Sequence, residues 1–272
     1  MFFDPTLLYL ATILPPIIMG IAIWKSDRFP EPTHLLVASF LLGAAIDIPL
    51  YLFIFIAEDL IAPLIGLDVY NKENYGIAEY AFSNFFRAAF LEEGIKFALL
   101  IFFCTRLADL NEPMDAVVYA SAIGLGYAAM ENVGYLMSKG SYDIASWSWA
   151  MVKVRYYPLV MHFGFGVVMG LFLSHALFGE RGAFKTRVMT ILALLVPVMY
   201  HGVYNYNRTF DTFPLLTLIF IIGIYYYLRK EQDRRITESQ DKIPIEKINI
   251  LYSYVATFGL VVIIIGSILL IH

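Results

Sequence analysis

Charge is what this 272-residue sequence has least of. Only 15% of its residues are charged, 60% are hydrophobic, and the mean hydropathy is +0.69. Soluble domains carry roughly a quarter charged residues, because their surfaces must be compatible with water. The composition therefore excludes an ordinary soluble domain and predicts that lipid solvates most of the exterior.

Three further absences narrow the function. Cys104 is the only cysteine, so an internal disulfide is excluded. The net charge is −4 and no long basic run occurs, which argues against nucleic acid as a partner. Residues 1–5 lack the positive region of a cleaved signal peptide, so the apolar stretch that follows is interpreted as a retained first helix.

Long hydrophobic runs, by contrast, are abundant. A bilayer-spanning helix needs roughly 20 apolar residues, and about eight windows qualify. These windows are 6–24, 34–57, 85–104, 114–137, 157–178, 187–207, 213–228 and 250–271. Internal repeats and low-complexity tracts are lacking. We therefore predict an all-α polytopic membrane protein made of one transmembrane domain, residues 1–272.

The distribution of Lys and Arg predicts the orientation. With the N-terminus outside, the loops facing the cytoplasm hold the excess of positive charge, much of it in the charged segment 229–249. That segment is predicted to be a solvated loop. Arg155 is then assigned to an external loop. The expected location is the plasma (inner) membrane, with both termini extracytoplasmic.

Ionisable side chains nevertheless occur inside four of the windows, where a charge costs about 2.5–3.5 kcal/mol. They are Arg87, Glu92, Glu93 and Lys96 in 85–104, Glu131 beside Asn132 in 114–137, His162 in 157–178, and His201 with Asn205 in 187–207. An ion pair that only holds the bundle together is the simplest explanation. Two adjacent carboxylates against one lysine leave an excess acid, however, and intramembrane ionisable groups mark functional sites by default.

The depths of these groups agree. With alternating helix directions, Glu92 lies about 10 Å, Glu131 about 9 Å, His162 about 8 Å and His201 about 9 Å below the outer ends of their helices, at 1.5 Å per residue. The sequence therefore predicts one conical buried site between helices 3–6. Adjacent glutamates point about 100° apart, so only one of Glu92 and Glu93 is expected to face a given pocket. Small residues, among them Gly124 and Gly166, are expected to let the helices approach closely.

The same residues carry a resemblance. EEGIK (Glu92 to Lys96) resembles the EExxK signature of the PrsW-type glutamic intramembrane proteases, and YAAMEN (Tyr127 to Asn132) resembles their second motif. His162 resembles their lone third-motif histidine, and HGVYN (His201 to Asn205) resembles their fourth motif. The order and spacing match over about residues 80–210, the expected catalytic core. The related CAAX prenyl endopeptidases typically show EExxxR and a second-motif histidine, which this chain lacks.

The resemblance implies an intramembrane endopeptidase that cleaves a membrane-anchored, single-pass protein in the bilayer, for example an anti-sigma factor. It implies that Glu92 activates a water as general base, that His162 and Glu131 help to hold this water, and that His201 and Asn205 donate to the oxyanion. Glu93 and Lys96 would form a supporting pair, and Tyr127 and Asn132 would lie around the site. No cofactor is implied.

Two alternatives stay open in the sequence. The two histidines and the glutamates could bind zinc and form a metalloprotease, although HExxH is lacking. Alternatively, the buried cluster could belong to a non-catalytic membrane scaffold or to a proton-coupled transporter. Transporters usually show repeated halves with broken helices, and no such symmetry is visible.

Overall fold

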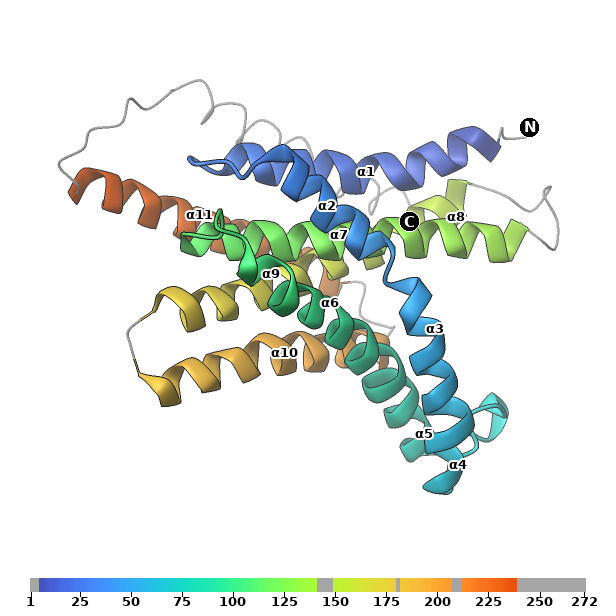
Figure 1. Cartoon of the computed structure of the whole chain (residues 1–272). Helices are drawn as coiled ribbons and strands as arrows, with labels where there is room; N and C mark the ends of the chain where they lie inside the picture. The colour runs from blue at the N-terminus through green and yellow to red at the C-terminus, as the bar shows by residue number, and fades with distance from the viewer. Residues whose placement is uncertain (1–4, 141–148, 180–181, 207–211, 239–272) are drawn as a thin grey trace.

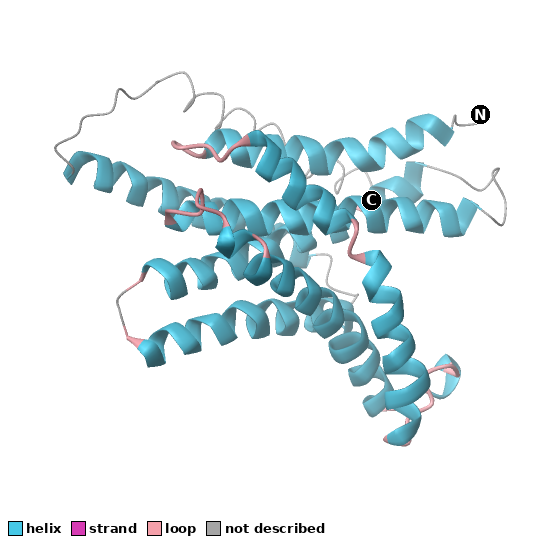
Figure 2. Ribbon diagram, in the orientation of Figure 1, coloured by secondary structure: helices cyan, strands magenta, loops and turns pink. Residues whose placement is uncertain are grey.

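The computed structural model describes residues 5–140, 149–179, 182–206 and 212–238. Within these ranges the regular elements are helical and no strand occurs, which confirms the all-α prediction (Figure 2). The α-helices are α1 (Pro5–Ser26), α2 (Thr33–Ala44), α3 (Asp47–Phe55), α4 (Ala62–Leu64), α5 (Ile77–Ala81), α6 (Leu91–Phe102), α7 (Pro113–Gly140), α8 (Trp149–Val154), α9 (Tyr156–Phe178), α10 (Ala183–Tyr206) and α11 (Thr212–Glu238). Two π-helical segments, η1 (Ile56–Ile61) and η3 (Phe82–Phe90), and two 3₁₀ turns, η2 (Lys72–Asn74) and η4 (Cys104–Arg106), complete the described elements.

Helices occupy the first seven predicted windows, and the eighth window, 250–271, lies outside the described residues. Four stretches of the described part are long and apolar enough to cross a membrane: Tyr9–Ser26, Thr33–Leu64, Val152–Phe178 and Ala183–Tyr206. Large apolar side chains cover the outside of several helices, and on α3 Ile48 is 78% exposed and Tyr51 75% exposed. Such a surface fits lipid as the solvent.

Helix α7 lies at the centre of the bundle and packs against α1, α2, α6, α9 and α11. Residues 114–129 of this helix are all buried, as expected of a helix surrounded by others on every side. One apolar cluster joins α7 to α1, α9 and α11 through Met19, Leu125, Phe163 and Ile221. A second joins it to α6 and α9 through residues such as Leu100 and Met169.

Glycines let α7 and α9 approach to backbone contact, as the small residues predict. A Cβ added to Gly124 would lie 2.5 Å from the carbonyl oxygen of His162, and one added to Gly166 would lie 2.5 Å from that of Ala120. These contacts are too short for any side chain. The glycines therefore fix the distance between the helix that carries Glu131 and the helix that carries His162.

The predicted helix 34–57 is interrupted. Helix α2 ends at Ala44, α3 begins at Asp47, and α3 turns away from the bundle (Figure 1). It packs on α6, and in the segments that continue these two helices Arg87 of η3 pairs with Glu58 of η1 at 2.7 Å. The two π-helical segments therefore lie opposite one another in the part of the molecule that projects from the bundle.

The charged segment after residue 228 differs from its prediction. Helix α11 continues to Glu238, so the beginning of 229–249 is helical instead of a solvated loop. The residues Arg229 to Glu238 include many strong helix formers. Gln232 is also only 4% exposed and bonds to Asp27 of the α1–α2 connection, which anchors this part of the helix.

Candidate functional site

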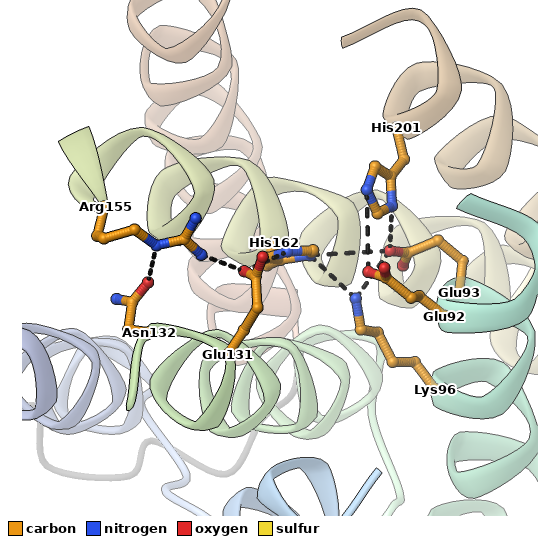
Figure 3. A network of polar contacts seen from close by, with 8 residues as sticks. All are labelled: Glu92, Glu93, Lys96, Glu131, Asn132, Arg155, His162 and His201. Atoms are coloured by element: carbon orange, nitrogen blue, oxygen red, sulfur yellow. Dashed lines mark hydrogen bonds and ion pairs between the residues drawn. The ribbon is translucent and has the colours of Figure 1, made fainter. Parts of the chain in front are cut away.

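Six of the predicted ionisable groups meet at one place, where α6, α7, α9 and α10 converge (Figure 3), whereas Arg87 pairs with Glu58. Helix α6 contributes Glu92, Glu93 and Lys96, α7 contributes Glu131, α9 contributes His162, and α10 contributes His201. One ligand atom each of Glu92, Glu93, His162 and His201 lies within 4.8 Å of the others. Four sequence segments that are far apart in the chain thus form a single polar cluster.

Glu93 and Lys96 form the buried centre of this cluster. The lysine Nζ lies 2.8 Å from Glu93 Oε1, and the two side chains are 2% and 0% exposed. The same Glu93 oxygen lies 2.9 Å from Nδ1 of His201. Because a carboxylate only accepts, Nδ1 of His201 carries the hydrogen and Nε2 is the nitrogen that remains for chemistry.

His162 is held by charged groups on both sides of its ring. Lys96 Nζ lies 3.0 Å from Nδ1, and Glu131 Oε2 lies 3.2 Å from Nε2. Since an ammonium only donates, Nδ1 accepts and Nε2–H donates to Glu131. Tyr127 packs against the ring edge-on, with centroids 4.9 Å apart, and Lys96 Nζ lies 4.1 Å from the tyrosine centroid. His162 is therefore fixed in tautomer and orientation.

Glu92 lies on the wall of a cavity of about 500 Å³, together with Glu131, His162, His201 and Asn205. Glu93 is not among the lining residues and lies behind its neighbour, so only one of the two adjacent glutamates faces the cavity, as predicted. Glu92 Oε2 lies 3.9 Å from His201 Nε2. This distance is too long for a direct hydrogen bond and is suited to a bridging water.

Arg155 belongs to the site, although the sequence assigned it to an external loop. Its Nη2 lies 2.7 Å from Glu131 Oε2, its Nε donates to Asn132 Oδ1 at 2.8 Å, and its guanidinium lies 4.7 Å from the Tyr135 ring (Figure 3). The signal that could have identified it is charge balance. Lys96 alone leaves the three carboxylates Glu92, Glu93 and Glu131 in excess, which calls for further cations, and Arg87 and Arg155 both line the cavity.

The remaining predicted residues take different places. Asn132 is fully buried but points to Arg155 and away from the histidines (Figure 3). Tyr127 lies against Lys96 and His162, as described above. Asn205 lines the cavity one helical turn after His201 and is half-buried.

The π-helical segment η3 comes immediately before the two glutamates. A π-turn widens the helix and rotates the residues that follow it, and such segments are frequent at functional sites. The segment η3 also packs closely on α10, since a Cβ added to Gly202 of α10 would lie 2.2 Å from the Phe85 ring of η3. This close contact of η3 with α10 holds the start of α6 beside His201.

The donor set of the cluster also fits a metal ion. Catalytic zinc takes three protein ligands of the His, Glu and Asp type and leaves one position open. Glu92 Oε2 and His201 Nε2 face one another across the 3.9 Å gap, and Glu93 Oε2 is buried without a hydrogen-bond partner in the described part of the chain. The side chains that could hold a zinc ion are Glu92, Glu93, His162 and His201, which each offer one ligand atom within 4.8 Å of the others.

Comparison with known proteins gives the same assignment as the motifs. Residues 31–228 match the family described as PrsW family intramembrane metalloprotease. Protease PrsW of Oceanobacillus iheyensis is 29% identical over 229 residues, which cover 82% of this chain and 95% of that protein. Protease PrsW of Bacillus subtilis is 30% identical over 229 residues, 83% of this chain and 94% of that protein. Protease PrsW of Clostridioides difficile is 30% identical over 200 residues, 73% and 78% of the two chains.

No solved structure matches this chain. The family match covers more than half of the sequence and includes each of the motif residues from Glu92 to Asn205. The chain belongs to the PrsW family of intramembrane proteases.

Proposed function

We propose that this intramembrane protease hydrolyses its substrate with a water that Glu92 activates, and that the water is held between Glu92 Oε2 and His201 Nε2. The observation that carries the proposal is the pair of facing atoms at 3.9 Å on the wall of the cavity. A water between them can make a hydrogen bond to each. General-base catalysis requires this kind of contact between the base and the proton that it removes.

In the proposed reaction Glu92 takes a proton from the water, and the water oxygen forms a bond to the scissile carbonyl carbon. The carbonyl oxygen becomes an oxyanion. When the tetrahedral intermediate collapses, the C–N bond breaks and the protonated Glu92 returns its proton to the leaving amide nitrogen. The carboxylate is regenerated, and no covalent enzyme intermediate forms.

Asn205 is assigned to the oxyanion. It lines the same cavity as Glu92, and its side-chain amide offers two N–H donors. In the tautomer that Glu93 fixes, His201 Nε2 accepts a hydrogen bond from the water, so the oxyanion donor in this scheme is Asn205. Donors that are already in place when the charge develops usually supply the largest part of the rate enhancement.

The other charged groups position Glu92 and His201. Glu93 fixes the His201 ring, Lys96 neutralises Glu93, and Glu131 and Lys96 together fix His162 beside them. In this proposal His162 orients the site and does not contact the water directly.

A metal-dependent variant of the same function is supported by the donor set. Glu92, Glu93, His162 and His201 would hold a zinc ion, which would polarise the scissile carbonyl and acidify its bound water. Lys96 would then orient Glu93 and His162 from behind.

We propose a substrate class from the position of the site in the bilayer, and an orientation from the distribution of Lys and Arg. A buried site of this kind admits a single-pass protein whose helix unwinds locally to expose its amide, for example an anti-sigma factor. The distribution of Lys and Arg supports a plasma-membrane location with both termini extracytoplasmic.

The test is N-terminal peptide profiling of membranes that contain the wild type, Glu92→Gln or the matched control Glu73→Gln, an exposed glutamate of the η2 turn. Each membrane is profiled with and without a chelator. We expect new termini within single-pass segments for the wild type and Glu73→Gln, and a loss of about 10²–10⁴-fold for Glu92→Gln, the usual contribution of a general base.

The chelator separates the two variants of the mechanism. Cleavage that persists supports the water activated by Glu92 alone, whereas cleavage that stops and returns with zinc supports the metal-dependent variant. Identical profiles for wild type and Glu92→Gln would overturn the proposal in both forms.

A further inference from the structure

A second polar cluster lies at the other end of the bundle. It consists of Asp27 in the connection between α1 and α2, Glu112 and Asp115 at the start of α7, and Gln232 of α11, and we call it the acidic cluster. Carboxylate oxygens of its three acids lie within 4.8 Å of one another. Along α7, Asp115 and Glu131 are 16 residues apart, about 24 Å at 1.5 Å per residue. The acidic cluster is therefore separate from the proteolytic site.

The acidic cluster is enclosed. Asp27 and Asp115 are each 1% exposed, and Gln232 is 4% exposed. Like charges at this separation repel one another strongly when water is excluded. Of the neighbouring arginines, Arg28 pairs with Asp233, whereas Arg229 donates to the carbonyl oxygen of Ser26 and offsets part of the charge of Asp27.

Backbone N–H groups donate to one carboxylate oxygen of each aspartate and not to the other oxygen. Asp27 Oδ1 accepts from the N–H of Phe29 at 3.0 Å, and Asp115 Oδ2 accepts from the N–H groups of Asn111 and Glu112 at 2.8 and 2.7 Å. In the described part of the chain, Asp27 Oδ2 has no hydrogen-bond partner, and the Asp115 carboxyl meets only the carboxyl of Glu31 besides the backbone. Buried carboxylate oxygens without partners are rare and require an explanation.

Gln232 gives an independent indication, because it is not an acid. Its amide Nε2 donates to Asp27 Oδ1 at 2.7 Å and to Glu112 Oε1, so the amide lies against two of the carboxylates. Its carbonyl Oε1 is buried without a hydrogen-bond partner among the described residues. A half-turn of the amide exchanges its N and O and presents this carbonyl to the cluster.

The ligand chemistry follows from these atoms. Every donor in the acidic cluster is an oxygen, either of a carboxylate or of an amide. Oxygen-only sites select hard divalent cations such as Mg²⁺, Ca²⁺ and Mn²⁺, whereas zinc prefers nitrogen and sulfur. A divalent cation would also remove the repulsion between the three acids.

We propose that Asp27, Glu112, Asp115 and Gln232 bind a hard divalent cation, which ties α11 to the α1–α2 connection and to the start of α7. Helix α11 contributes Ile221, Ile224 and Leu228 to the apolar cluster that it shares with α1, α7 and α9. The cation therefore stabilises the packing of the helix on the bundle. This proposal does not depend on the mechanism of peptide hydrolysis.

Protonation is the competing way to remove the charge. Burial raises the pKa of the Asp27 and Glu31 carboxyls, and Glu31 accepts a hydrogen bond from Tyr119 beside the cluster. A carboxyl whose pKa is raised on folding binds its proton more tightly in the folded protein, so stability rises as pH falls through the raised pKa. The groups facing Asp27 are Gln232, Glu31, Glu112, Asp115 and Arg229.

The experiment measures thermal unfolding of the full chain, freed of metal, at neutral pH with Mg²⁺, Ca²⁺ or Mn²⁺ added, and Mn²⁺ binding by electron paramagnetic resonance. The variants are Asp27→Asn and Asp115→Asn. Glu73→Gln removes an exposed charge as a control, and Glu92→Gln controls for binding at the proteolytic site. We expect the cation to raise the unfolding midpoint of the wild type and of both controls.

Asp27→Asn and Asp115→Asn should bind Mn²⁺ at least about tenfold more weakly. Even substitution of residues that only hydrogen-bond to metal ligands costs about 10–100-fold in metal affinity. Without cation, Asp27→Asn should unfold at a higher temperature than the wild type, because one of the mutually repelling charges is gone. A higher unfolding midpoint together with weaker Mn²⁺ binding shows that the variant is folded. A midpoint that rises on acidification but ignores all three cations, or a cation effect that survives in Asp27→Asn, overturns the proposal.

Discussion

The side chain of Arg155 joins two consecutive residues of α7, Glu131 and Asn132, to the start of α9. Glu131 in turn holds Nε2 of His162. An arginine suits this position because its planar guanidinium donates in two directions at fixed angles, which a lysine ammonium does not. Arg155 therefore acts on the site by positioning Glu131.

We predict that Arg155→Gln lowers peptide hydrolysis by about 10–100-fold, as does loss of other residues that orient a reactive centre. The loss should fall on kcat more than on KM, because the ring orientation changes while the cavity remains. Arg155→Lys should restore part of the activity, since one ion pair can re-form. Steady-state kinetics with a reconstituted substrate measures both effects.

Arg106→Gln is the charge-matched control, since Arg106 lies exposed in the η4 turn. It should leave kcat unchanged. A wild-type kcat for Arg155→Gln would show that Glu131 is held well enough without it.

Residues inside long apolar windows were predictable one by one, whereas Arg155 was not. Glu92, Glu131, His162 and His201 stand out because each is an isolated polar group in a hydrophobic segment, and counting residues gives its depth. Arg155 lies at the joint of α8 and α9, where sequence gives neither burial nor direction. The sequence likewise does not show that Glu131 contacts His162 whereas its neighbour Asn132 contacts only Arg155 among the site residues.

At the scale of elements, the α7–α9 contact decides whether the site residues meet. Gly124 lies against the carbonyl of His162, so this contact and the site share a residue. Any side chain at Gly124 must push α9 away, and His162 moves with it.

We predict that Gly124→Ala destabilises the folded protein by about 1–3 kcal/mol, the usual cost of overpacking, and reduces activity together with stability. Gly134→Ala in the same helix is the control, since an added Cβ there meets nothing within 4 Å. In that case the better helix propensity of alanine should leave stability equal or slightly higher. Thermal unfolding in detergent compares the two, and equal midpoints would contradict the close contact.

The hydrophobic windows predicted where the helices lie, but they did not predict where a helix is interrupted. The window 34–57 was predicted as one helix, yet α2 ends at Ala44, α3 begins at Asp47, and α3 packs on α6 as well as on α7. The π-helical segments left no sign in composition. The extension of α11 depends on Gln232 and Asp233, whose partners lie about 200 residues earlier in the chain.

At the scale of the whole molecule, the two polar clusters lie toward opposite ends of α7. In Figure 1 the α1–α2 connection, the start of α7 and the end of α11 gather at the left, whereas the N-terminus, α8 and the connection from α4 to α5 lie at the right. The helices between carry the exposed apolar side chains. This arrangement is compatible with successive crossings of one bilayer.

The proposed orientation places the right-hand end outside the cell, and the single cysteine makes this testable. Cys104 is fully buried, so Cys104→Ser should be tolerated and provides a background without thiols. In that background we introduce Glu73→Cys in the η2 turn and Ala108→Cys in the connection before α7, both at exposed positions. We predict that a membrane-impermeant maleimide labels intact cells at position 73 and labels position 108 only after permeabilisation.

The reverse pattern would invert the orientation and place the acidic cluster outside, where Ca²⁺ is the more abundant hard cation. Equal labelling at both positions in intact cells would mean that the two turns do not lie on opposite sides of the membrane.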